Sequence, residues 1–115
     1  MPYIKVNDTV WWNCDLKSSE YNAMINTDNY HKDFNKSQSE HIIDQKKGYE
    51  YIININYNPE RIAPRGFAIF FHGFTDNYFT EGCVAIPQEN LKKFITMADE
   101  NSVIIIDELK NIYNY

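Results

Sequence analysis

Hydrophobic and polar residues alternate clearly in only one part of the chain, and this part predicts the strands. The segment 49–57, YEYIININY, has aromatic or aliphatic residues at every second position, interrupted only by Ile52. This pattern is typical of a strand with one buried face. A turn is expected at 58–61, NPER. The run 67–71, FAIFF, is almost continuously apolar and ends at His72-Gly73, which predicts a strand buried on both faces.

A helical period replaces this alternation after Pro87. Pro87 suits the first position of a helix, and Glu89 in the first turn is favoured by the helix dipole. The expected apolar stripe, at the spacing of one helix face, consists of Leu91, Phe94, Ile95 and Ala98. We expect the helix to end at 101–102, and the run 103–106, VIII, to form another buried strand.

The first 45 residues have poor periodicity and are rich in Asn, Asp, Lys and Ser, with isolated aromatic residues. We interpret them as loops and short turns whose aromatic side chains anchor onto a core formed by later residues. A loop-like stretch of this length is unusual in a compact domain and leaves open that the chain is part of something larger. The predicted fold class is mainly β with one amphipathic helix. The predicted organisation is a single domain, 1–115, with a loop-rich part, 1–45, and a core that carries the site, 49–106.

Composition narrows the class of protein. With 115 residues, 43% of them hydrophobic and 16% aromatic, the chain is typical of one folded domain rather than of a disordered, collagen-like or coiled-coil protein. The net charge is −5 and the 11 Lys and Arg residues form no basic stripe, so nucleic acid is not expected as the main partner. No stretch is apolar enough for a membrane span and no signal peptide is visible, so membrane insertion is not expected.

The cysteines and histidines predict no metal centre. Cys14 and Cys83 allow one disulfide at most, and we interpret them as reduced thiols. The spacing of Cys14, His41, His72 and Cys83 matches no zinc pattern, so neither a metal nor another cofactor is predicted.

The segment 70–87, FFHGFTDNYFTEGCVAIP, carries the candidate chemistry. His72 closes a predicted strand, and Cys83 follows eleven residues later, directly after Gly82. A free thiol has a pKa near 8.5, so a cysteine nucleophile needs a base such as an imidazole. A backbone carbonyl just after His72 could fix the tautomer of that base, and the Cys83 amide could face an oxyanion. The residues alone leave open a packed cysteine and a histidine held by a backbone carbonyl.

This segment resembles the catalytic core of the L,D-transpeptidases (the YkuD-type domain), which cross-link or modify peptidoglycan. The family pattern is a His-Gly pair, a variable loop and Ser/Thr-x-Gly-Cys, matched here by His72, Gly73, Thr80, Gly82 and Cys83. The short His-to-Cys loop and the GCVAI sequence resemble one subgroup, as do SEHII at 39–43 and YEY at 49–51 upstream.

The resemblance implies an L,D-transpeptidase-like β-sandwich, whole or partial, and a cysteine acyltransferase. Cys83 would be the nucleophile, His72 the general base and the Gly73 carbonyl its orienting group. Amides around Gly82 and Cys83 would form the oxyanion hole, and Thr80 would shape the loop. The enzyme would form a thioester with a peptidoglycan stem tetrapeptide and pass it to an amine or water. The family is also acylated by carbapenems, and it implies a cell-envelope or secreted location.

Three departures from the family pattern bear on this expectation. Glu81 stands where the commoner pattern has His, and its charge could raise the pKa of the thiol. Val84-Ala85 replaces the commoner Arg. Nothing in 1–48 matches the family's upstream Gly-Asp-Gly-x-Thr-Pro segment, so we expect the C-terminal portion of a longer or split protein, with a missing N-terminal subunit or a second copy as partner. The alternatives are an inactive relative that acts as a binding module and a different thiol hydrolase.

Further substrate-binding candidates lie near the motif or in the stretch that resembles the subgroup. Tyr78 and Phe79 precede Cys83 and are predicted to form a substrate wall. His41, next to Glu40, is predicted to line the site, and the alternative is a structural histidine bonded by backbone.

Overall fold

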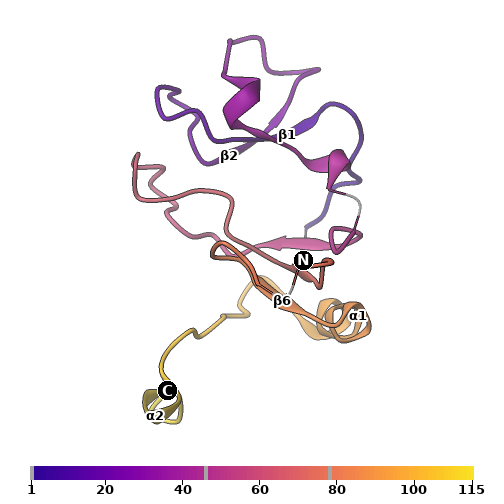
Figure 1. Cartoon of the computed structure of the whole chain (residues 1–115), viewed down its shortest axis with the longest axis vertical. Helices are drawn as coiled ribbons and strands as arrows, with labels where there is room; N and C mark the ends of the chain where they lie inside the picture. The colour runs from indigo at the N-terminus through magenta and orange to yellow at the C-terminus, as the bar shows by residue number, and fades with distance from the viewer. Residues whose placement is uncertain (1, 46, 78) are drawn as a thin grey trace.

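The computed structural model describes residues 2–45, 47–77 and 79–115, and the strands within these ranges form two small sheets (Figure 1). The first sheet is antiparallel, with the order β2-β1-β3. The second sheet has the order β4-β5-β6, with β4 antiparallel and β6 parallel to β5. The strands are β1 (Val10–Asn13), β2 (Ala23–Asn26), β3 (Glu40–His41), β4 (Ile52–Asn54), β5 (Phe70–Gly73) and β6 (Val84–Ile86). The predicted mainly β class is confirmed.

The helical elements are short apart from α1. Two 3-10 turns flank β3, η1 (Lys36–Gln38) and η2 (Ile42–Asp44), and the helices are α1 (Gln88–Met97) and α2 (Leu109–Ile112). No helix in the described part of the chain is long and apolar enough to cross a membrane.

The core lies between the two sheets and is built by both halves of the chain. The ring of Trp12 on β1 packs edge-on against Phe70 on β5, with centroids 4.9 Å apart. The buried cluster consists of Val10, Trp12, Cys14, Ile42, Ala68 and Phe70. The expectation of loops before residue 45 therefore misses a sheet there. The reason is that strands of two to four residues are too short to show a period.

The strand predicted over 49–57 is much shorter in the structure. Asn56 and Asn58 have left-handed backbone, with φ of 61° and 51°, which ends the extended conformation. As a result Tyr51 and Tyr57, predicted on the buried face, are 45% and 51% exposed. The strand predicted over 67–71 is shifted, because Ala68 is also left-handed, with φ of 53°; β5 starts at Phe70 and ends with the His-Gly pair.

The predicted helix is present, but it ends at Met97, before the expected 101–102, and the strand predicted after it is wrong. In α1, Leu91 is fully buried and the ring of Phe94 contacts that of Phe71, with centroids 5.1 Å apart. The run 103–106 is not a strand; Val103 is 79% and Ile106 is 68% exposed. Figure 1 shows this yellow segment leaving the body of the molecule. Its apolar residues fit a strand, but within the described residues the second sheet ends at β6.

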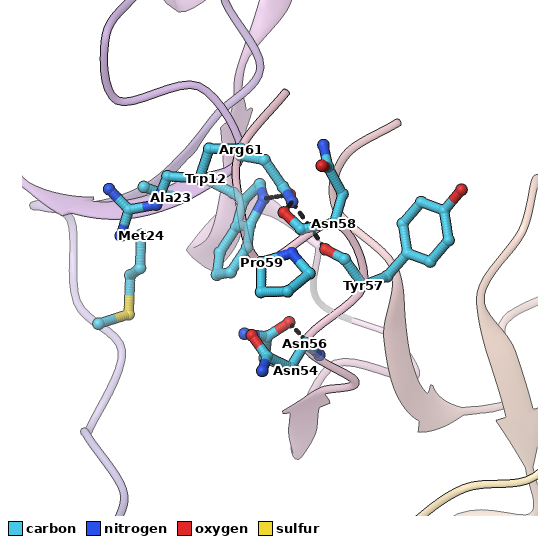
Figure 2. A pocket seen from close by; sticks show the side chains of 10 residues that line it. Trp12, Ala23, Met24, Asn54, Asn56, Tyr57, Asn58, Pro59 and Arg61 are labelled. Atoms are coloured by element: carbon cyan, nitrogen blue, oxygen red, sulfur yellow. Dashed lines mark hydrogen bonds between the residues drawn. The ribbon is translucent and has the colours of Figure 1, made fainter. Parts of the chain in front are cut away.

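A buried asparagine fixes the chain just before β5. Asn22 Oδ1 accepts hydrogen bonds from Trp12 Nε1 at 3.0 Å and from the Ala68 amide at 3.1 Å. Its Nδ2 donates to the carbonyls of Tyr57 and Asn58, at 2.9 and 3.1 Å. The cavity beside it, of about 410 Å³, is drawn in Figure 2; its other lining residues are Ala23, Met24, Asn54, Asn56, Pro59 and Arg61. Asn22 thus sets the position of Ala68, whose carbonyl contacts Cys83.

Candidate active site

His72 and Cys83 line one cavity of about 270 Å³ at the β5–β6 pair. His72 pairs with Ala85 across the two parallel strands, and Cys83 lies two residues before Ala85. Since side chains alternate along a strand, this register places His72 and Cys83 on the same side of the sheet. The other lining residues are Phe74, Thr75, Asn77, Phe79, Thr80 and Ala85.

The imidazole of His72 is held by the backbone carbonyl that the sequence predicts. The side chain is buried, and Nδ1 lies 2.6 Å from the Gly73 carbonyl oxygen. In the tautomer that this contact favours, Nδ1–H donates to the carbonyl and Nε2 carries a lone pair. A Cβ at position 73 would collide with Oε1 of Gln88 at the start of α1, so a larger residue there would have to displace the Gln88 side chain.

The sulfur of Cys83 is hydrogen-bonded to backbone. Sγ donates to the Ala68 carbonyl at 3.4 Å and accepts from the Phe70 amide at 3.4 Å; His72 is not among its hydrogen-bond partners in the described residues. The pKa of Cys83 is raised, first by burial and then by the charge of Glu40. Hydrogen bonds from the Phe70 backbone and the Tyr49 side chain act in the opposite direction. The arrangement is that of a resting, protonated thiol.

The acidic residue that acts on the thiol is not the one suspected from sequence. Glu81 is exposed and does not contribute to the raised pKa of Cys83, whereas Glu40 of β3 does. Sequence proximity is a poor guide here, because Glu40 belongs to β3 of the other sheet and is distant from Cys83 in the sequence.

The loop before Cys83 is shaped by the residues of the motif. Thr80 Oγ1 donates to the Cys83 carbonyl at 2.5 Å. Gly82 has a φ of 136°, and a Cβ there would lie 3.0 Å from Cδ1 of Ile69, so a side chain would be strained. Phe79 lines the cavity and is 72% exposed. Tyr78, the other predicted wall residue, lies outside the described residues.

His41 lies away from this cavity, on the N-terminal sheet. Its Nδ1 is 2.9 Å from Oδ2 of Asp44, its Nε2 is 2.8 Å from the Asp8 carbonyl, and its ring stacks on Trp11 at 4.3 Å. These contacts match the structural alternative considered from sequence, and a role in substrate binding stays a prediction.

The second thiol is protected by burial. Cys14 is 2% exposed, and burial together with the charge of Glu40 raises its pKa to about 12. Neither cysteine is disulfide-bonded in the described part of the chain. Within residues 2–45, 47–77 and 79–115, no group of three or more His, Cys, Asp and Glu side chains could hold a metal ion.

Sequence reasoning missed one aromatic residue of the site. The ring of Tyr49 lies beside the His72 imidazole, with centroids 4.8 Å apart, and packs with Cys83 against the buried core cluster. The only signal in the sequence was the position of Tyr49 in the segment similar to the subgroup, which does not indicate a direction for its side chain.

Comparison with known families identifies the chain. The model of the YkuD family, the L,D-transpeptidase catalytic domain, matches residues 2–106. The match includes both sheets, the cavity with His72 and Cys83, and helix α1. The chain therefore belongs to the L,D-transpeptidase catalytic domain family, a family of enzymes with a function related to peptidoglycan. Comparisons with curated proteins and with solved structures give no match.

Proposed function

We propose that the chain is a peptidoglycan L,D-transpeptidase or L,D-carboxypeptidase that works through a thioester on Cys83. The observation that carries the proposal is the shared cavity of His72 and Cys83, with Nδ1 of His72 held by the Gly73 carbonyl. This arrangement leaves Nε2 as the proton acceptor on the same side of the sheet as the sulfur.

In the first half-reaction, Sγ leaves its contacts with Ala68 and Phe70 and transfers its proton to Nε2 of His72. The thiolate attacks the carbonyl between the L-centre and the terminal D-residue of a stem tetrapeptide, forming a C–S bond. Backbone amides around Gly82 and Cys83 stabilise the oxyanion. The C–N bond then breaks, and His72 gives its proton to the leaving D-amino acid.

The second half-reaction runs in the reverse direction with a different nucleophile. An amine of another stem peptide, or water, loses a proton to Nε2 of His72 as it attacks the thioester. The C–S bond breaks, and the proton returns to the Cys83 sulfur. Thr80 keeps the loop in place through the Cys83 carbonyl, and Phe79 forms a wall for the peptide.

Acylation by a carbapenem tests the nucleophile directly. We expect the intact mass of the folded protein to increase by one carbapenem, and Cys83→Ser to abolish the adduct. Cys14→Ala is the matched control; it should retain the adduct, because Cys14 is buried with a raised pKa. Absence of the adduct on folded protein, or its persistence in Cys83→Ser, contradicts the proposal.

The substrate class needs a separate assay. Release of the terminal D-amino acid from a tetrapeptide, with no cleavage of an ordinary L-peptide, supports the transpeptidase or carboxypeptidase activity. Cleavage of both peptides indicates a different thiol hydrolase. Binding of the tetrapeptide without any adduct on Cys83 indicates a binding module.

A further inference from the structure

A second cavity, of about 410 Å³, lies between the two sheets and shares no lining residue with the candidate active site (Figure 2). Trp12 is opposite Met24 on β1 and β2, and Asn54 of β4 is opposite Phe70. Opposite residues of antiparallel strands share a face, and Trp12 packs against Phe70, so these side chains lie on the inner faces of the sheets. The volume falls in the range of small-ligand sites, roughly 300–1,000 Å³.

The turn that lines this cavity is held in place by asparagine side chains. Nδ2 of Asn58 donates to the carbonyls of Ile62 and Gly66, both at 3.0 Å. Asn22 in turn donates to the carbonyls of Tyr57 and Asn58. The cavity is therefore formed before a ligand binds, and binding does not have to order the turn.

Exposed side chains with free hydrogen-bonding groups line the cavity. Oδ1 of Asn54 accepts from the Asn56 amide at 3.0 Å, but Nδ2 of Asn54 and the side chain of Asn56 have no partner among the described residues. Arg61 is the only charged residue among those described residues that line the cavity, and it donates one of its five N–H groups to Glu20 at 2.5 Å. The cavity therefore offers hydrogen bonds without a free charge.

Arg61 has a backbone conformation that an arginine rarely adopts. Its φ is 57°, in the left-handed region that glycine and asparagine tolerate best. The other left-handed residues of this turn, Asn56 and Asn58, are asparagines. Glycine would satisfy the backbone at position 61 without strain, and a strained residue of this kind indicates a function for its side chain.

We propose that this cavity binds an N-acetylated amino sugar of a glycan chain. A carboxamide donates and accepts hydrogen bonds at once, and so does an acetamido group, so Asn54 and Asn56 match it. The acetamido methyl group and the C–H face of the sugar ring fit the apolar surfaces of Met24 and Pro59. Figure 2 shows Met24 and the two asparagines on different sides of the Trp12 and Pro59 rings.

The pair of Arg61 and Glu20 favours an uncharged ligand. The guanidinium donates to hydroxyl groups and the carboxylate accepts from them. An ionised peptide carboxylate, in contrast, would find the one cation of the cavity already paired and would be repelled by Glu20. The inference rests on the proposed function, because the glycan strands of peptidoglycan carry the stem peptides and are built of N-acetylated amino sugars.

NMR of the full chain tests the proposal, because each tryptophan gives its own indole N–H signal. A trimer of N-acetylglucosamine is titrated into the ¹⁵N-labelled protein. Trp12 lines the cavity and its Nε1–H is bonded to Asn22, so its signal should shift to saturation. Trp11 stacks on His41 on the other face of β1, and its signal should not move. A glucose trimer, which lacks acetamido groups, should bind at least about fivefold more weakly.

Two variants test the lining residues. Arg61→Gly and Asn54→Ala should each weaken binding about three- to tenfold, as expected for lost hydrogen bonds. Since glycine suits the backbone at position 61, the midpoint of urea denaturation of Arg61→Gly should stay close to that of the parent protein. Arg65→Ala is the matched control, because it removes a neighbouring arginine that does not line the cavity, and it should leave the affinity unchanged.

The proposal is overturned if the Trp12 signal does not shift to saturation, if both tryptophan signals shift equally, or if Arg61→Gly and Asn54→Ala bind like the parent protein. Equal affinity for the glucose trimer, or displacement of the N-acetylglucosamine trimer by the free stem tetrapeptide, also overturns it. A carbapenem adduct on Cys83 without sugar binding contradicts this inference alone. Sugar binding by folded protein without an adduct contradicts the proposed function alone.

Discussion

The two sheets each hold one histidine, and the two imidazoles are bound in different ways. His41, at the outer face of the N-terminal sheet, has a hydrogen-bond acceptor at each ring nitrogen, Asp44 and the Asp8 carbonyl. His72, at the inner face of the second sheet, has one acceptor, the Gly73 carbonyl, among the described residues. An imidazole with two acceptors is stabilised as the cation, whereas one with a single acceptor keeps a lone pair on its other nitrogen.

This difference separates a structural histidine from a candidate base. The contacts of His41 raise its pKa, first through the Asp8 carbonyl and then through Asp44. The two contacts connect the N-terminal segment to η2 and occupy both ring nitrogens of His41, so neither nitrogen is free to take a proton from a substrate or a thiol. His72 pairs instead with the strand that follows Cys83 and shares the cavity with the thiol.

The largest expected effect is the difference in the rate of D-amino acid release between a variant of His72 and a variant of His41. His72→Asn keeps a donor for the Gly73 carbonyl and removes the base, so the rate of D-amino acid release should fall about 10²–10⁴-fold. His41→Gln should leave this rate close to that of the parent protein. Both rates are measured on a stem tetrapeptide at pH 7, with circular dichroism as the control for folding. Equal losses in the two variants would mean that His41 takes part in substrate binding, as the sequence predicts.

The orientation of His72 should depend on the close approach of Gly73 to α1. In Gly73→Ala the new methyl group would displace Gln88, at a cost of about 1–3 kcal/mol in the free energy of unfolding. Gln88 has both side-chain polar atoms buried without a hydrogen bond among the described residues, so shortening it is tolerable. The double variant Gly73→Ala/Gln88→Ala should recover most of the loss in urea denaturation. An additive double variant would show that the clash lies elsewhere, at the Gly48 carbonyl.

The local geometry of the site was more predictable from sequence than its surroundings. His72, Gly73, Thr80 and Cys83 lie within twelve residues, so one strand end and one loop determine their contacts. The bond from His72 to the Gly73 carbonyl and the bond from Thr80 to the Cys83 carbonyl are of this local kind. Tyr49, whose ring lies beside His72, and Glu40, whose charge raises the pKa of Cys83, belong to distant segments, so the sequence around the motif does not indicate them.

The secondary structure shows a similar limit: hydrophobic periodicity predicts an element only when that element is long enough. Helix α1 has ten residues and is amphipathic enough to be identified from its apolar stripe. The strands of the N-terminal sheet have at most four residues, and isolated left-handed residues such as Asn56 and Ala68 end extended segments that look continuous in sequence. The run 103–106 shows that apolar, β-branched composition predicts a strand only where a partner strand is available.

The smallest predicted effect concerns the pH dependence that His41 gives to stability. Its folded pKa is raised, so its stabilising contribution is fully present below the unfolded value of about 6.5 and is lost as the pH rises through the folded value. The side chain is 21% exposed and Asp44 is 70% exposed, so the loss should be less than about 1 kcal/mol. Urea denaturation at pH 6 and pH 8.5 should show this decrease in the parent protein and a smaller one in His41→Gln. An NMR titration of the His41 ring protons should give a midpoint above 6.5. A midpoint at or below that value would contradict the stabilisation of the His41 cation by Asp44 and the Asp8 carbonyl.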